Sequence, residues 1–267
     1  MKKDTIWNQY KDKLIIGNGT YGQIYKAYDI NSKNYVAVKE IDKMRFKQNN
    51  NSNLIENGKI NSKYKFWKDI IETKEKYYII MDLCLCNLED YLNMRDSLSI
   101  DEIRKILIQL NEILKITEKE NIIFKDLKPS NILITFSKID EIKIKLYKIS
   151  TIESIDETKS NMNSIEGICL TTAPEILKGE SISKQSDLWS LGIIIYYMLF
   201  KEYPYNGEIE YQNQINSNKR LKKTSDQELN DIINRTLKVN KNERISWNNY
   251  FNHNFFKKDS IKQKLIK

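Results

Sequence analysis

The sequence predicts an α+β fold of two lobes, because segments typical of strands come first and segments typical of helices follow. Before about residue 82, β-branched and aromatic residues lie between turn signals in "KLIIGNGTYGQIYKAYD", "YVAVKEI" and "YYIIMDL". After it, "SIDEIRKILIQLNEILKITEK" begins with a capping box of Ser99 and Glu102 and carries apolar residues at helical spacing. The segments "SKQSDLWSLGIIIYYMLF" and "DQELNDIINRTL" are two more predicted helices. We therefore expect one domain with a strand-rich lobe at 10–82 and a mostly helical lobe at 83–257.

The composition excludes several classes of protein. With 267 residues, 40% of them hydrophobic and 30% charged, the chain is typical of a globular domain. Its longest apolar run, Leu191 to Phe200, is too short to span a bilayer, and "MKKDTIWNQY" lacks the apolar core of a secretory signal. Cys84, Cys86 and Cys169 are odd in number and lack metal-ligand spacing, which indicates reduced thiols. We therefore expect a cytoplasmic protein without a transmembrane segment.

The net charge of +8 comes from lysines distributed along the whole chain, which is typical of a solvated surface. Nucleic-acid binding requires a concentrated basic stripe with aromatic residues or a known module, and the sequence contains neither. The last ten residues, 258–267, form a short basic tail that leaves contact with a membrane or an acidic partner open. We therefore expect no nucleic-acid partner.

A glycine-rich motif lies between the first two predicted strands. "IIGNGTYGQIYKA" holds Gly17, Gly19 and Gly22, where the missing Cβ atoms allow backbone N–H groups to approach phosphate oxygens. The motif alone also fits a hairpin, and it precedes a strand rather than a helix, which argues against a dinucleotide fingerprint. Seventeen residues after Gly22, "VAVK" places Lys39 on the third strand. A lone strand lysine is usually solvated, but in this register it would point toward the α- and β-phosphates of a nucleotide.

Together with the motifs that follow, these residues resemble the Ser/Thr class of eukaryotic protein kinases over residues 10 to 257. "KDLKPSNILI" is similar to the catalytic loop, and "TAPEIL", "SDLWSLG", "NERIS" and "NHNFF" follow in the family's order. Arg244 resembles the arginine that pairs with the glutamate at Glu175. The order around Met81 and "DYL" is somewhat similar to the autophagy-initiating kinases. The resemblance implies a bilobal protein-kinase fold, ATP or ADP as cofactor, and a protein substrate or regulatory protein as partner.

The resemblance also assigns roles to single residues. It implies Asp126 as the catalytic base, Lys128 as a phosphate contact and Asn131 as the metal ligand of the catalytic loop. Asn87 is a candidate ribose contact. Asp82 and Cys84, at the hinge between the lobes, would bind adenine through their backbone groups. The implied nucleotide-binding residues are Ile16, Gly17, Gly19, Gly22, Ile24, Ala37, Lys39, Asp82, Cys84, Leu133 and Lys148.

The chain departs from the family's pattern at the aspartate–phenylalanine–glycine triplet. Lys148, Ile149 and Ser150 stand in its place after "EIKIKL". The missing aspartate normally holds Mg²⁺ against the β- and γ-phosphates. An ammonium group about 4 Å from a divalent ion is repelled by about 8 kcal/mol at an effective dielectric constant of about 20, before screening. We therefore expect conventional Mg²⁺ placement to fail.

Further departures affect switching more than packing. Phe124 replaces the catalytic-loop histidine, Lys125 replaces the arginine, and Ile168 stands where Ser/Thr kinases carry a threonine near the catalytic aspartate. Glu56 is the candidate partner of Lys39 from the small-lobe helix. The nearby Gly58 weakens such a helix by about 1 kcal/mol relative to alanine. Apolar packing positions are thus retained while metal-handling and switching positions are lost.

The sequence favours a nucleotide-binding Ser/Thr-kinase homologue with impaired phosphotransfer that acts through protein partners in signalling. Two alternatives remain open. One is an active, slow Ser/Thr kinase that transfers the γ-phosphate of ATP to protein hydroxyls, with Asn131 holding a single metal ion. The other is a scaffold that binds no nucleotide. Phosphate transfer separates the first two interpretations, and a nucleotide-induced rise in melting temperature separates the first from the third.

Overall fold

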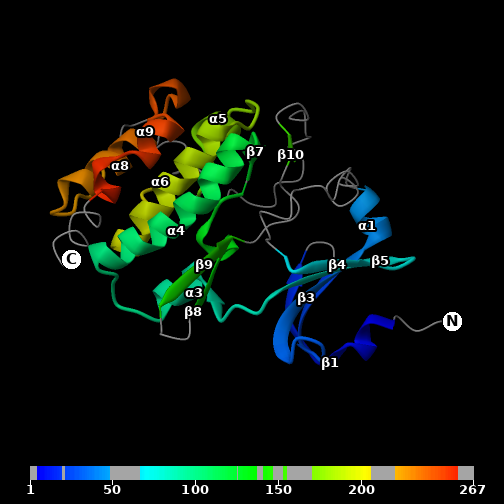
Figure 1. Cartoon of the computed structure of the whole chain (residues 1–267). Coiled ribbons are helices and arrows are strands. Elements are labelled where there is room, and N and C mark those ends of the chain that lie inside the picture. The colour runs from blue at the N-terminus through cyan, green and yellow to red at the C-terminus, as the bar shows by residue number, and fades with distance from the viewer. Residues whose placement is uncertain are drawn as a thin grey trace. The chain divides into compact units, whose positions relative to one another are not determined.

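The chain forms two compact units, Met1–Leu85 and Cys86–Lys267. The first contains an antiparallel sheet and the second contains most of the helices (Figure 1), which confirms the predicted α+β class. The structure is a computed structural model that describes residues 5–19, 22–48, 67–124, 126–136, 141–146, 153–154, 170–205 and 220–257.

The first unit is built on a five-stranded antiparallel sheet in the order β1-β2-β3-β5-β4. The predicted strand segments are confirmed, and Lys39 lies on the third strand as expected. The elements of this unit are η1 (Thr5–Asn8), β1 (Tyr10–Gly19), β2 (Gly22–Asp29), β3 (Asn34–Asp42), α1 (Lys43–Gln48), β4 (Asp69–Glu72) and β5 (Lys76–Asp82).

One face of this sheet carries the hydrophobic core of the unit. Because side chains alternate along a strand, every second residue of β2, β3 and β5 points to this face. Trp7 and Ile71 pack against the cluster from its margin. Its buried members are Ile6, Tyr10, Tyr25, Ala27, Val36, Val38, Tyr78 and Ile80.

The opposite face of the sheet carries three of the predicted nucleotide-binding residues, Ile24, Ala37 and Lys39. Ile24 pairs with Lys39, and Lys39 pairs with Ile79, so these three side chains share that face. Ala37 and Met81 form the next pair on it. Sequence alternation therefore separates the core face from the face with the candidate site.

The second unit contains the long helices and two small sheets, ordered β6-β8-β9 and β10-β7. Its helices are α3 (Leu88–Asn93), α4 (Ile100–Lys119), α5 (Pro174–Leu177), α6 (Lys184–Phe200), α8 (Gln227–Thr236) and α9 (Trp247–Phe251). Its 3₁₀ turns are η3 (Pro129–Asn131), η5 (Lys241–Glu243) and η6 (Asn254–Phe256). Its strands are β6 (Cys86–Asn87), β7 (Ile122–Ile123), β8 (Ile132–Phe136), β9 (Ile142–Leu146) and β10 (Glu153–Ser154).

Helix α6 is the central helix of the second unit. All of its residues from Ser186 to Met198 are buried, and α4 and α8 pack against it. Helix α4 begins where the sequence predicts, because Ser99 and Glu102 form the expected capping box. The polar residues of α6 are therefore shielded from water, and each needs a partner inside the protein.

Two pairs of strands flank the segment 124–131. Strand β7 precedes this segment and pairs with β10, while β8 follows it and pairs with β9. The triplet position lies in the sequence between β9 and β10. Both strands that border the triplet position are thus paired with strands that border the 124–131 segment.

Some predictions concern residues that lie outside the described ranges: Glu56, Gly58, Lys125, Lys148, Ile149, Ser150, Ile168 and Cys169. Within those ranges, Cys84 and Cys86 form no disulfide, as expected from the sequence. None of the helices described is long and apolar enough to cross a membrane.

Candidate functional site

The segment after β7 brings the three predicted catalytic-loop residues together. Lys128 Nζ lies 3.1 Å from Asp126 Oδ2. Asn131 Nδ2 donates to the Asp126 carbonyl at 2.7 Å and lies 3.3 Å from the Asp126 carboxylate. Pro129 starts the η3 turn that carries Asn131 back toward Asp126. The Asp126 carboxylate and the Lys128 ammonium group thus lie side by side. Because Asn131 uses its NH₂ group toward Asp126, its amide oxygen faces away from Asp126.

Helix α6 contacts the segment before Asp126 through the buried carboxylate of Asp187. The backbone N–H of Phe124 donates to Asp187 Oδ2 at 2.7 Å. One turn later, Ser190 Oγ donates to the Thr171 carbonyl at 2.8 Å. Asp126, Thr171, Asp187 and Ser190 all border one small cavity of about 30 Å³. Two residues one turn apart on α6 therefore fix both the candidate catalytic segment and the segment that leads into α5.

A buried ion pair joins Glu175 of α5, next to this segment, to Arg244. Arg244 grips Glu175 with two bonds, Nη1 to Oε1 at 2.7 Å and Nη2 to Oε2 at 2.6 Å, which confirms the pairing expected from the sequence. Ser186 Oγ adds a third bond to Oε1 at 2.9 Å. Burial is the largest influence and raises the pKa of the Glu175 carboxyl, but the bonds and charge of Arg244 outweigh it and leave the pKa below its usual value. Glu175 is therefore held as a carboxylate.

In the first unit, the glycine motif and Lys39 lie in one row across the sheet. Gly17 pairs with Ile24, which pairs with Lys39. Neighbouring strands lie about 4.8 Å apart, so Gly17 and Lys39 flank Ile24 within about 10 Å. Ile16 precedes this row and is 47% exposed, while Lys39 is 7% exposed. The row therefore places an apolar side chain between a glycine and a lysine.

The glycines of the motif differ in what surrounds them. A Cβ on Gly22 would lie 2.1 Å from the carbonyl oxygen of Glu40 in β3, which is an overlap with backbone. Among the described residues, a Cβ on Gly17 would meet only the Ile24 side chain, at 3.8 Å from Cδ1 and 3.9 Å from Cβ, which are ordinary contacts. Gly22 is therefore required by close packing of the sheet, whereas nothing in the sheet requires a glycine at position 17.

This difference gives a testable prediction. Gly22→Ala is expected to lower the free energy of unfolding by about 1–3 kcal/mol or more, because backbone must shift. Gly17→Ala is expected to change it by less than about 1 kcal/mol, because the new methyl group fits and the unfolded chain loses freedom. Urea denaturation of both variants measures the two changes. Equal loss in both would contradict the packing account.

The two hinge candidates lie at and just beyond the end of β5. Asp82 ends the strand, and its carboxylate pairs with Lys68 at 2.8 Å. The Cys84 thiol lies 3.9 Å from the Asp82 carbonyl, a contact at the limit for a weak sulfur donor. The role expected at both residues uses backbone groups, so the side-chain pairing of Asp82 does not compete with it.

Leu133, one of the implied nucleotide-binding residues, lies in the middle of the β6-β8-β9 sheet. It pairs with Asn87 on one side and Lys145 on the other. Asn87 also caps α3, because its Oδ1 accepts from the Asp90 N–H at 2.8 Å. The ribose candidate therefore has a structural role that holds its side chain in place.

Asn131 is the candidate metal ligand among the described residues. Mg²⁺ prefers carboxylate oxygens near phosphates, and Asn131 offers an amide oxygen while the Asp126 carboxylate already contacts Lys128. Over the described ranges, no three His, Cys, Asp or Glu side chains gather as metal ligands. The sequence position of the usual second ligand holds Lys148, a cation.

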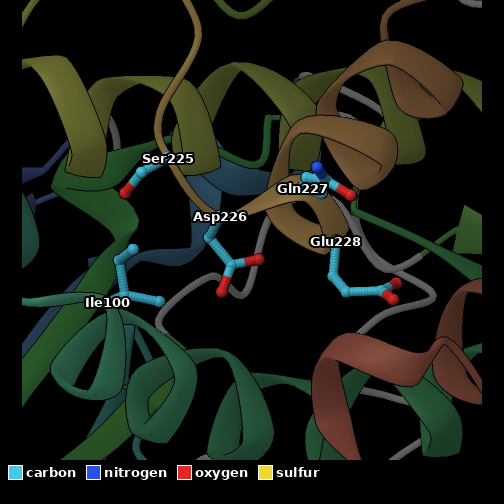
Figure 2. A pocket seen from close by; sticks show the side chains of 5 residues that line it. All are labelled: Ile100, Ser225, Asp226, Gln227 and Glu228. Carbon is cyan, nitrogen blue, oxygen red and sulfur yellow. The ribbon is translucent and has the colours of Figure 1, made fainter.

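A larger cavity of about 440 Å³ lies elsewhere in the second unit, at the N-termini of α4 and α8. Figure 2 shows Asp226 and Glu228 directed into the open space beside Ile100. Asp226 caps α8 by accepting from the Leu229 N–H, and it lies 3.8 Å from Arg104 Nη2. This cavity contains none of the predicted site residues, and Asp226 serves the helix end.

The anchors on α6 were missed as functional positions by the sequence reasoning. Asp187 was noted as part of a motif without a contact, and Ser190 was not singled out. No local pattern reports a bond between residues 63 or 19 positions apart.

Comparison with known proteins agrees with the motif order. A family model described as "Protein kinase domain" matches residues 10–256. The fold of the two units, with a five-stranded antiparallel sheet followed by a helical part, is that of this family.

Individual relatives are all similar at a modest level. Serine/threonine-protein kinase atg1 of Dictyostelium discoideum is 30% identical over 89% of this chain and 38% of its own length. Serine/threonine-protein kinase D3 of Homo sapiens is 28% identical over 93% of this chain and 29% of its own length. A Dictyostelium discoideum protein named "Probable inactive serine/threonine-protein kinase" is 32% identical over 34% of this chain and 12% of its own length. The chain thus spans less than half the length of these relatives.

Proposed function

Because the chain belongs to the protein kinase domain family, we propose that it is a nucleotide-binding Ser/Thr-kinase homologue whose phosphotransfer is impaired. One observation carries the proposal. Lys128 and Asn131 both contact Asp126, yet the sequence puts Lys148 where the family's metal-binding aspartate is expected. The protein would then act in signalling through protein partners. In this proposal the kinase domain comprises residues 10–257, and residues 258–267 form a basic tail.

Three features support nucleotide binding as the retained function. The row of Gly17, Ile24 and Lys39 is in register, and Ala37 lies on the same face of the sheet. Gly17 is not needed for packing, so its bare backbone has no structural explanation in the sheet. The name of the probable inactive relative indicates that similar sequences include kinases considered inactive. Three cysteines without metal-ligand spacing favour reduced thiols, so the proposal places the protein in the cytoplasm.

A slow, active Ser/Thr kinase is the second candidate, and the close approach of Lys128 to Asp126 favours it. In this version Asp126 accepts the proton of a substrate hydroxyl and Lys128 contacts the phosphate that is transferred. The buried ion pair of Glu175 and Arg244 holds α5 in place, and both candidate functions require this part of the second unit to be folded.

The deciding experiment compares wild type with Asp126→Ala in two measurements. We expect ATP at about 100 times its dissociation constant to stabilise both proteins by about 2.7 kcal/mol, a rise in melting temperature of about 5 °C or more. We expect phosphate transfer from ATP to a generic protein substrate to be equally low in both, because no positioned metal supports it. Mass spectrometry of the substrate measures the transfer.

Other outcomes select the alternatives. Transfer by wild type at least about 100-fold above Asp126→Ala would identify an active kinase, since a positioned base contributes at least that factor. No thermal shift with ATP or ADP in wild type, with or without Mg²⁺, would identify a scaffold that binds no nucleotide.

A further inference from the structure

An irregularity in β1 puts Lys11 and Leu14 on the same face of the five-stranded sheet. Lys11 pairs with Tyr28 and Leu14 pairs with Lys26, so three steps along β1 match two steps along β2. The extra residue forms a β-bulge, and Asp12 within it has a positive φ of 52°. Directly paired residues share a face of a sheet, and so do residues two positions apart on a strand. The bulge therefore brings these two side chains of β1 to the face that carries Tyr28 and Lys26.

Tyr35 of β3 completes this face at the end of the β2-β3 hairpin. It pairs with Tyr28, and the two rings contact edge to face with their centroids 5.3 Å apart. Lys26 Nζ lies 4.4 Å from the centroid of the Tyr35 ring, a cation–π contact. Leu14 is 61% exposed and Tyr35 is 47% exposed. We call Lys11, Leu14, Lys26, Tyr28 and Tyr35 the hairpin patch, and none of them belongs to the predicted nucleotide-binding set.

The hairpin patch is positively charged. Within the described part of the chain, neither Lys11 nor Lys26 forms an ion pair with a carboxylate. Lys33, in the turn between β2 and β3, is a further exposed cation. Asp12 is exposed in the bulge, whereas Asp29 is buried and bonded to the backbone of the following turn. The lysines therefore outnumber the exposed carboxylate, so the patch attracts anionic groups.

The geometry of the patch favours a protein as the anionic partner. The Tyr35 ring has Lys26 over it and Tyr28 against it at an interplanar angle of 69°, which disfavours the stacking of a nucleic-acid base. The adjacent turn reads "NSK" at residues 31–33, without the apolar side chains that insert into a membrane. The chain's own tail, residues 258–267, is basic and would be repelled. An acidic segment of another protein supplies both the carboxylates and the apolar contacts that the patch lacks.

We propose that the hairpin patch binds an acidic, extended segment of a partner protein, with a carboxylate at Lys11 and an apolar side chain against Leu14 and Tyr28. The inference rests on the proposed action through protein partners and not on nucleotide binding. Lys11 and Leu14 stand opposite residues two positions apart on β2, a spacing of about 6.6 Å along the strand. Side chains two positions apart in an extended segment have the same spacing and face the same side. An acidic residue and an apolar residue separated by one position therefore match this pair.

The test selects peptides from a displayed library of random sequences on the wild-type chain. Peptides that bind the double variant Lys11→Glu/Leu14→Ser are removed first, so the selection reports on the patch. The affinity of the selected peptides for wild type and for each single variant is then measured by fluorescence anisotropy. Lys74→Glu is the matched control, because it makes the same change of charge at an exposed position between β4 and β5 of the same unit. Circular dichroism verifies that each variant is folded.

We expect the selected peptides to carry an acidic residue two positions from an apolar one. Lys11→Glu should weaken their binding about tenfold because attraction becomes repulsion, and Leu14→Ser should weaken it about tenfold because an apolar contact is lost. Lys74→Glu should leave it unchanged. Raising the ionic strength from about 0.1 M to about 1 M shortens the Debye length from about 10 Å to about 3 Å and should also weaken binding.

Two results would overturn the inference. One is a selection that yields no acidic peptides, or peptides that bind Lys11→Glu and Leu14→Ser as tightly as wild type. The other is tighter binding of a single-stranded RNA oligonucleotide, or of vesicles of phosphatidylserine, than of any selected peptide. Titration calorimetry with ATP on the same proteins reports separately on the proposed nucleotide binding, because the substituted side chains lie outside the predicted nucleotide-binding set.

Discussion

Arg244→Ala is expected to lower the free energy of unfolding by about 3–5 kcal/mol, the cost of leaving a buried carboxylate without its partner. The Glu175 side chain is 4% exposed and the Arg244 side chain is fully buried, so water cannot replace the lost bonds. Arg244 also donates to the Gln185 carbonyl at 2.7 Å and to the Lys238 carbonyl at 2.8 Å, which would lose their donor. Urea denaturation followed by circular dichroism measures the change.

The matched control is Arg235→Ala, because Arg235 pairs with Asp231 at 3.4 Å on the exposed surface. Exposed pairs contribute about 0–1 kcal/mol, so this variant should remain close to wild type. The double variant Glu175→Leu/Arg244→Met should be less destabilised than the sum of its single changes, since no charge is left buried alone. Similar losses in Arg244→Ala and Arg235→Ala would contradict the structural role of the buried pair.

The same pair predicts a pH dependence with a definite sign. The folded-state pKa of Glu175 lies below its usual value, because Arg244 outweighs the effect of burial. Its contribution to stability is therefore complete above the usual pKa of a glutamate and is lost as the pH falls through the lowered folded-state pKa. Wild type should lose stability on acidification over this range more steeply than Glu175→Gln does.

Lys148→Asp is expected to make nucleotide binding depend on Mg²⁺, with an increase of about 100-fold or more in affinity on adding the ion. Wild type should bind ATP or ADP equally well in EDTA, or better than in Mg²⁺. A third of the repulsion estimated between the lysine and a divalent ion already corresponds to about 100-fold in occupancy. An aspartate would remove this repulsion and add a carboxylate ligand, while Lys148→Ala should weaken binding because a phosphate contact is lost.

Lys143→Asp is the control for Lys148→Asp, because it makes the same change of charge on the exposed face of β9. It should leave the Mg²⁺ response as in wild type. Titration calorimetry with ATP and ADP, in EDTA and in Mg²⁺, gives all the affinities required. Strictly Mg²⁺-dependent binding by the wild-type protein would refute the role proposed for Lys148.

Local patterns predicted most of the secondary structure because they depend on neighbouring residues alone. The capping box at Ser99 requires only residues three positions apart, and it is present. Period-two alternation placed Lys39 on a strand, and the register then put it opposite Ile24. The same rule applied to "IKIKL" would have placed Lys145 and Lys143 on one face of β9 before the structure was known.

Contacts between distant residues could not be obtained in this way. The bond from the Phe124 N–H to Asp187 joins positions 63 residues apart, and that from Ser190 to the Thr171 carbonyl involves a backbone atom that every residue possesses. The pairing of Glu175 with Arg244 was expected from a family resemblance and not from any periodicity. Such contacts depend on how helices and loops pack, which a local pattern does not record.

The sequence by itself determined the α+β class, the order of the motifs and the presence of a lysine where a metal-binding aspartate is expected, because these are matters of residue identity and spacing. Only the tertiary structure decided why Gly22 is required, since the Glu40 carbonyl that excludes a Cβ belongs to another strand. It also decided that the segment before Asp126 is attached to α6, because the buried Asp187 carboxylate on that helix needs a donor and the Phe124 N–H supplies it.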